Sequence, residues 1–72
     1  MFPLNLTDRG HVRVVRVLGN DETKKRLEDL GFFPEQEIEI LNKVSDSLIV
    51  RVGESRIALD ETGCGHVFVE DV

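Results

Sequence analysis

The 72-residue chain is 40% hydrophobic and 32% charged, with a formal net charge of −5 and a sequence pI near 4.9. A chain of this length forms one small domain that buries only roughly 60% of its unfolded surface, which leaves little room for an enclosed substrate cavity. The acidic balance repels a phosphate backbone, so we expect no nucleic-acid partner. These limits favour a module that binds through its outer face.

The N-terminal segment and the cysteine content indicate where the protein works. Residues 1–9 lack the basic start and the long apolar run of a signal peptide. The longest apolar runs, such as Leu48-Ile49-Val50, are too short to cross a bilayer, so we expect no direct membrane insertion. Cys64 has no second cysteine with which to form an internal disulfide, which is typical of a reducing compartment. We therefore expect a cytoplasmic location.

The first part of the chain predicts an extended lead-in followed by a bent strand. In residues 2–9 the apolar side chains Phe2, Leu4 and Leu6 lie at alternate positions, and the segment ends in a turn at Asp8-Arg9-Gly10. A valine-rich strand follows over residues 11–18, and its alternation slips at Val14 and Val15, which indicates a β-bulge. Such a bulge is one way in which a small sheet bends enough to close on itself.

A short helix is predicted after this strand. Asn20 or Asp21 can cap its N-terminus by accepting hydrogen bonds from free N–H groups. Leu27 and Leu30 lie on one face, and we expect both to pack on the sheet, because an isolated helix of roughly ten residues is marginal in water. Gly31 can adopt a positive φ and end the helix.

A corner containing Phe32, Phe33 and Pro34 separates the helix from the next strand. The proline prevents the helix from continuing, and at least one phenylalanine is expected to turn inward and fasten the helix end to the sheet. Past the proline the period changes to two, with Ile38 and Ile40 on one side of a strand.

The second half of the chain predicts a series of short strands. Strands are expected over residues 37–43, 47–52 and 55–59, joined by hairpins, and a last strand over residues 67–69. Residues 60–64 are typical of a turn or a single helical turn. With five short strands and one inserted helix, the economical fold is mainly β, a small and strongly bent antiparallel barrel in which the first and last strands meet.

Four segments carry a family resemblance: the corner with Arg26-Leu27, Leu30-Gly31-Phe32 and Pro34, the opening Pro3-Leu4 with Gly10, the strand Arg56-Ile57-Ala58-Leu59, and the final Gly65-His66-Val67-Phe68-Val69-Glu70. Together they resemble the ferrous-iron transport protein A (FeoA) family over nearly the whole chain. The resemblance implies a single FeoA-type SH3-like domain over residues 1–72, a five-stranded antiparallel barrel with one short α-helix inserted after the first strand. It also implies a cytosolic accessory to the membrane permease FeoB, which has a cytoplasmic GTP-binding domain.

Two positions depart from the family pattern. The family usually places Gly after the proline, which suits a type II turn with positive φ, whereas Glu35 favours a type I turn. The run Gly63-Cys64-Gly65 replaces the more usual Leu, Ala or charged residues of the last turn.

The chemically reactive side chains do not form a catalytic set. A nucleophile needs an activating base and an orienting third group, and the obvious candidates are only Cys64, His11 and His66, so we predict a non-enzymatic protein without a cofactor. Cys64 and His66 form a Cys-x-His pair, the weak candidate for a metal site with zinc or iron, yet we favour a small thiol in the core beside a surface histidine. His11 is expected roughly 15 Å from His66, at about 3.3 Å per residue along paired strands.

The charged residues have ordinary interpretations. We favour a solvated helix face for Lys24-Lys25-Arg26 over an electrostatic docking patch. Arg13 and Arg16 cannot both point the same way in an unbulged strand, so no continuous basic stripe is expected. Glu37 and Glu39 share one strand face without a cleft, which indicates an exposed face and not an acid–base pair.

The apolar residues supply the partner-binding candidates, Leu27, Phe32, Phe33, Ile49 and Phe68. Ile49 and Phe68 each lie between two apolar neighbours, so one barrel face cannot bury all of these side chains. The favoured interpretation is that Phe68 or Ile49 packs beneath the helix. Otherwise these two, with Phe32 or Phe33, form the apolar centre of a protein-binding site.

The sequence thus favours a cytoplasmic accessory of ferrous-iron uptake, a monomer or weak homo-oligomer that acts on the GTP-binding part of a FeoB-type permease at the inner face of the membrane. The alternative is a metal-sensing or regulatory domain like the C-terminal domain of iron-dependent repressors, with Cys64 and His66 as ligands. Against it, the 72 residues predict no DNA-reading helix-turn-helix. A nucleic-acid-binding barrel would need a basic aromatic face, and the composition argues against one.

Overall fold

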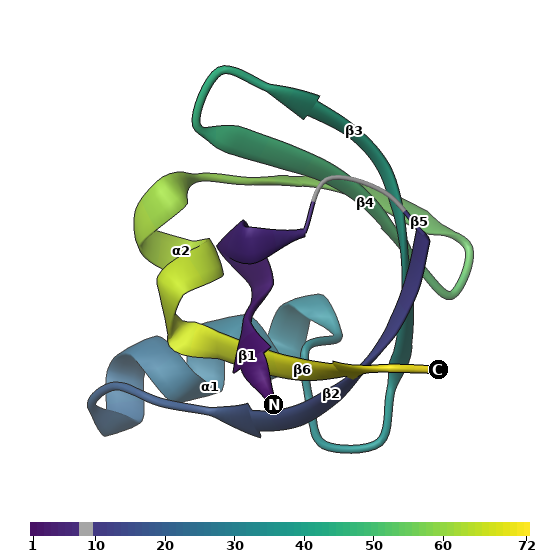
Figure 1. Ribbon diagram of the computed structural model, residues 1–72. Coiled ribbons are helices and arrows are strands. Elements are labelled where there is room, and N and C mark those ends of the chain that lie inside the picture. The colour runs from purple at the N-terminus through teal and green to yellow at the C-terminus, as the bar shows by residue number, and fades with distance from the viewer. Residues whose placement is uncertain (8–9) are drawn as a thin grey trace.

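The computed structural model describes residues 1–7 and 10–72. These residues form a sheet of six antiparallel strands in the order β1-β6-β2-β3-β4-β5, which curls into a barrel (Figure 1). The elements in chain order are β1 (Phe2–Pro3), the 3-10 helix η1 (Leu4–Leu6), β2 (Gly10–Val17), α1 (Asp21–Leu30), β3 (Glu37–Val44), β4 (Ser47–Val52), β5 (Ser55–Leu59), α2 (Glu61–His66) and β6 (Val67–Asp71).

The mainly β fold is confirmed, as is the pairing of the first long strand with the last, because β2 lies antiparallel to β6. The structure adds three elements to the expected set, and one of them, the 3-10 helix η1, corrects the expectation that the whole lead-in is extended. The lead-in contributes the two-residue strand β1, which pairs with the end of the chain through β6. Residues 60–64, expected as a turn or single helical turn, belong to the N-cap and first four residues of α2. The expected turn at residues 8–10 falls largely outside the described residues.

Two register shifts bend the sheet. The predicted bulge in β2 is confirmed, since the pairing with β6 shifts between Val14 and Arg16 and leaves Val15 without a partner of its own. A second shift lies between Ile40 and Asn42 in β3, where the adjacent apolar residues Ile40 and Leu41 interrupt the alternation in the same way but were not interpreted as a bulge. Each extra residue increases the local twist, which lets so short a sheet wrap around one core.

The core fills the inside of the curled sheet. Alternate residues of the strands point inward, and Leu27, Phe32 and Cys64 are added from the two helices and the corner. In the described part of the chain no polar or charged residue is fully buried. The buried residues are Leu4, Val12, Val14, Val17, Leu27, Phe32, Ile38, Ile40, Leu48, Val50, Val52, Leu59, Cys64, Val67 and Val69.

Helix α1 begins and ends as predicted but turns a different face to the barrel. The Asn20 side chain accepts a hydrogen bond from the Thr23 N–H, and Gly31 ends the helix with φ 111°. Leu27 is 1% exposed, whereas Leu30 is 42% exposed, so the expectation that both leucines pack on the sheet was wrong for Leu30. The inward line runs through positions 23, 27 and 31, four residues apart, and a Cβ at Gly31 would lie 2.7 Å from a Val52 methyl.

The turn after α1 corrects the expectation of a type I turn. Gln36 N–H donates to the Phe33 carbonyl, and Glu35 has φ 76°, which is the conformation of the third residue of a type II turn. Two hydrogen bonds to β2 hold this backbone: Glu35 N–H donates to the Val14 carbonyl at 2.7 Å, and Val14 N–H donates to the Gln36 carbonyl at 2.9 Å. The hydrogen bonds between this turn and the bulged strand β2 therefore stabilise a positive φ that glutamate ordinarily disfavours.

Helix α2 lies across the remaining opening of the barrel (Figure 1). It contacts β1, η1 and β6 at one end of the sheet order and β4 near the other. Asp60 caps it by accepting a hydrogen bond from the Gly63 N–H at 2.8 Å. The two ends of the sheet are thus bridged by helical segments packed on the core.

Candidate partner-binding surface

Two of the five partner-binding candidates lie in the core. Leu27 is 1% exposed and Phe32 is fully buried, so neither is available to a partner, and their assignment to a binding surface was wrong. Phe32 is the phenylalanine that turns inward: its N–H donates to the Leu27 carbonyl at the end of α1, which directs the chain back into the barrel. Phe33 is 43% exposed and remains a surface candidate.

Ile49 and Phe68 are half-buried on the outer side of the sheet, because each alternates with fully buried neighbours. Ile49 belongs to β4 and Phe68 to β6, and β2 and β3 lie between these strands in the sheet. Three strand spacings of about 4.8 Å separate the two side chains along the surface, roughly 14 Å. The structure therefore does not bring them together into one apolar centre.

The surroundings of Phe68 combine apolar and basic groups. Its neighbours across the strands are Pro3 of β1 and Arg16 of β2. Because Arg13 pairs with Glu70 and Arg16 with Phe68, two residues apart on β6, the bulge in β2 places both arginines on the outer side. Arg13 is neutralised by Glu70 at 2.9 Å, so the two do not form a continuous basic stripe.

Several exposed apolar side chains were not singled out from the sequence. One of them, Leu30, flanks the end of α1 together with the predicted candidate Phe33, and the turn that follows holds this corner against β2. No periodic signal distinguished these side chains from core residues, because exposure here depends on how α1 rotates against the barrel. The other exposed apolar residues in the described part of the chain are Met1, Leu6, Leu18, Val44 and Val72.

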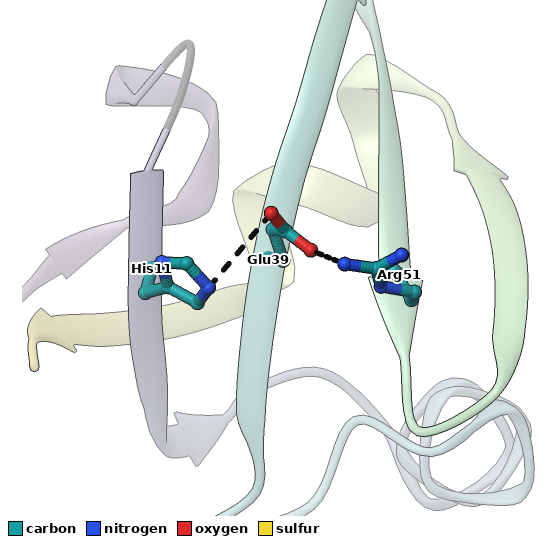
Figure 2. Close-up of polar contacts among 3 residues, drawn as sticks. All are labelled: His11, Glu39 and Arg51. Atoms are coloured by element: carbon teal, nitrogen blue, oxygen red, sulfur yellow. Dashed lines mark hydrogen bonds and ion pairs between the residues drawn. The ribbon is translucent and has the colours of Figure 1, made fainter.

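A row of polar and charged side chains crosses the outer face of the barrel. His11, Glu39 and Arg51 lie side by side on β2, β3 and β4 (Figure 2). The Glu39 carboxylate accepts a hydrogen bond from Arg51 and lies 3.8 Å from His11 Nε2. The row continues to Arg56, which lies directly opposite Arg51 on β5. Glu39 therefore acts as the acidic member of a cross-strand network, which fits the expectation of an outer strand face.

The weak candidates for a metal site, Cys64 and His66, are held apart by the geometry of α2. The Cys64 thiol is buried and donates to the Leu59 carbonyl at 3.5 Å, while His66 Nδ1 lies 2.7 Å from the Thr62 carbonyl. Burial raises the pKa of the Cys64 thiol, and the nearby Asp60 carboxylate acts in the same direction. Metal ions are bound by the thiolate, which this environment disfavours.

Histidines and acidic residues elsewhere do not complete such a site. Among residues 1–7 and 10–72 no three His, Cys, Asp or Glu side chains are arranged to hold a metal ion. His11 precedes the paired residues Val12 and Asp71, whereas His66 precedes Val67 at the opposite end of the same ladder. The two histidines thus lie at opposite ends of paired strands, as the sequence predicted.

The sheet curls into a barrel, a capped helix lies between its first two long strands, and its outer face has mixed character. The protein is therefore a small SH3-like β-barrel domain. A family model described as the FeoA domain matches residues 2–71. The chain therefore belongs to the FeoA domain family. A search of curated proteins found no match.

Solved structures agree with this assignment. The chain resembles an iron uptake regulatory protein (FeoA) with 29% identity and a TM-score of 0.86, over 93% of this chain and 92% of that one. It also resembles a FeoA-like protein from Clostridium acetobutylicum with 20% identity and a TM-score of 0.88, over 99% of this chain and 86% of the other.

The same fold occurs within longer metal-related regulators. ScaR with bound Cd²⁺ matches with 22% identity and a TM-score of 0.88, over 99% of this chain but only 36% of the ScaR chain. At this identity the similarity shows the fold alone. No helix among the described residues is long and apolar enough to cross a membrane.

Proposed function

We propose that this protein is a cytoplasmic, non-enzymatic accessory of ferrous-iron uptake that binds the GTP-binding part of a FeoB-type permease and is thereby recruited to the inner face of the membrane. The observation that carries the proposal is the FeoA family match over residues 2–71. The resemblance to an iron uptake regulatory protein over nearly the full length of both chains supports a regulatory role in iron homeostasis.

The chemistry of the surface supports a binding role. The thin core is filled by side chains, while Phe33 remains exposed and Phe68 remains partly exposed near the Arg13–Glu70 ion pair. Exposed aromatic side chains surrounded by polar groups are typical of the centres of protein interfaces. We assign the protein's contribution to contacts with another polypeptide and not to bond-making chemistry.

Metal sensing, the alternative from the sequence, is supported by fold similarity alone. The Cys64 thiol is fully buried and bonded to a backbone carbonyl, and His66 interacts with the backbone of its own helix. No specific observation in the described part of the chain favours this alternative, so we do not propose it.

The test is a pull-down with the isolated GTP-binding portion of the permease, nucleotide-free and loaded with GDP or a GTP analogue. We expect capture of the folded domain in at least one nucleotide state, weakened by Phe33→Asp or Phe68→Asp. Val44→Asp is the matched control, because Val44 is 53% exposed and lies at the tip of the β3–β4 hairpin. If the folded, unmutated domain is captured in no nucleotide state, the proposed partner is wrong.

A further inference from the structure

The two edge strands of the sheet, β1 and β5, differ in how they are protected against pairing with a further strand. β1 has only two residues, and one of them, Pro3, has no N–H to offer to another strand. β5 has five residues, Ser55–Leu59, with no proline, and among the described residues it pairs only with β4. An edge of this kind presents a row of unpaired backbone donors and acceptors that can template a further strand.

Burial along β5 shows that its free side is open. Ser55, Arg56 and Ala58 are exposed, and Ile57 is only partly buried even though it points to the core. No hydrogen bond in the described part of the chain connects the backbone of residues 55–58 to an element other than β4. Among the residues that the structure describes, none pairs with the outer edge of β5, which leaves this edge available to another extended segment.

Two arginines lie next to each other beside this edge. Arg56 lies directly opposite Arg51, an arrangement of like charges that is destabilising in a sheet. Glu39 neutralises Arg51, whereas no ion pair joins Arg56 to another residue that the structure describes. The chain thus keeps one uncompensated guanidinium on its open edge, although its formal net charge is −5.

An apolar position follows the guanidinium on the same face. Ala58 lies two residues after Arg56, so both side chains point outward, and its cross-strand neighbour is the half-buried Ile49. A segment laid along β5 would therefore meet a positive charge at one outward position and an apolar surface at the next. The complementary segment carries a carboxylate and an apolar side chain two positions apart.

We propose that β5 is a docking edge for an extended segment of a partner polypeptide, which adds a strand to the sheet and presents an acidic side chain to Arg56 and an apolar one to Ala58 and Ile49. Main-chain hydrogen bonds supply affinity in this mode of recognition, and the alternate side chains supply specificity. The identification of the partner rests on the proposed function, whereas the chemistry of the segment rests on β5 alone.

Pairing of β5 with the β5 strand of a second copy does not satisfy this pattern. The five residues of β5 contain no carboxylate, so two β5 strands paired with each other leave Arg56 without an acidic neighbour. Antiparallel pairing centred on Arg56 would even place the two guanidinium groups opposite each other. The charge pattern therefore selects an acidic partner over self-association.

The first test uses a synthetic peptide with threonine at every odd position and glutamate and valine alternating at the even positions. Added to ¹⁵N-labelled protein, it should shift the amide resonances of residues 55–59 and slow hydrogen exchange of β5. The matched peptide with lysine in place of glutamate should not. Arg56→Glu should weaken binding by about tenfold or more, since it replaces attraction with repulsion. Arg26→Glu, an equal charge change at an exposed arginine on α1 and outside this edge, should leave it unchanged.

The outcomes separate this proposal from the proposed function. If the lysine peptide binds as well, if the acidic peptide causes no shift in β5, or if only a single-stranded oligonucleotide shifts Arg56, the docking edge is wrong. Mapping the binding site of the permease fragment on the labelled protein then tests whether the permease uses β5. Shifts confined to Phe33 or Phe68 would retain the permease as partner and overturn β5 as its site. Binding of the acidic peptide without binding of the permease fragment would retain the edge and overturn the partner.

Discussion

The two helices start in the same way and then diverge. Asn20 before α1 and Asp60 before α2 have the same backbone angles, φ −75° and ψ 173°, and each side chain accepts a hydrogen bond from the N–H three residues later, at 2.8 Å. α1 then continues for ten residues, most of them exposed, and inserts Leu27 into the core. α2 has only six residues and lies partly inside the barrel, with Gly63 and Cys64 buried.

The difference shows what holds each helix in place. α1 has good helix formers and strong end signals, so its extent follows from local sequence. α2 contains Gly63 and Gly65, which oppose helix formation, and it persists because its backbone fills the space beside Leu59. One helix is thus locally encoded and anchored by a side chain, whereas the other is imposed by close packing of its backbone.

The largest expected effect comes from removing the anchor of α1. Leu27→Ala should lower the free energy of unfolding by about 2–4 kcal/mol, because the buried side chain leaves a cavity. Leu30→Ala should cost less than about 1 kcal/mol, since Leu30 is 42% exposed. Urea denaturation followed by circular dichroism measures both. Equal losses would show that both leucines anchor the helix, as the sequence alone suggested.

The next effect tests the close packing of α2. A Cβ at Gly63 would lie 2.8 Å from Leu59 Cδ1 and 2.9 Å from its Cγ, so Gly63→Ala should destabilise the protein by about 1–3 kcal/mol. Gly65→Ala should be neutral or stabilising by up to about 1 kcal/mol, because a Cβ there meets nothing within 4 Å and alanine favours the helix. A gain in stability for Gly63→Ala would contradict the packing account of α2.

Replacing the N-cap residue of each helix compares directly how much the two caps contribute to stability. Asn20→Ala and Asp60→Ala should each cost about 1 kcal/mol. The loss for Asp60 should be the larger, because the bond it makes to Gly63 is partly buried and water replaces it poorly, whereas the bond from Thr23 to Asn20 is exposed. Thermal unfolding of the two variants side by side gives the order. The reverse order would mean that water reaches Gly63 N–H freely.

The smallest effect is a dependence of protein stability on pH that arises from Cys64 in α2. Because burial raises the pKa of the Cys64 thiol in the folded state, the unfolded chain releases its proton first as the pH rises. The resulting stabilisation is fully present below the ordinary thiol pKa of 9.0 and is lost as the pH rises through the folded value. Urea midpoints measured across this range should fall more steeply for the natural protein than for Cys64→Ala. Parallel curves would indicate that the thiol ionises equally in both states.

Local signals in the sequence were sufficient for much of the fold. Alternation located the strands, the slip at Val14 and Val15 located the bulge, and Asn20 and Gly31 set the limits of α1. These features depend on interactions within a few residues, which a linear pattern records. The conformation of Glu35 depends instead on hydrogen bonds to Val14, more than twenty residues away in the chain, and no local preference indicated it.

The candidate surface was less predictable than the fold. Five apolar side chains looked alike in the sequence, but the structure buries Leu27 and Phe32, exposes Phe33, and leaves Ile49 and Phe68 half-buried on strands that are not neighbours. The open edge at β5 could not be recognised from the order of strands along the chain. Which strand ends at an edge is decided only when the sheet is assembled.

The amino-acid sequence by itself determined a small, acidic, mainly β domain, because composition, alternation and capping act over short distances along the chain. Membership of the FeoA family follows from the match over residues 2–71. Tertiary structure alone decided which way α1 faces, that a glycine-rich segment becomes α2, and that Arg56 lies beside Arg51 on an open strand. These features depend on contacts between residues far apart in sequence, where the space left by one element fixes the conformation of the next.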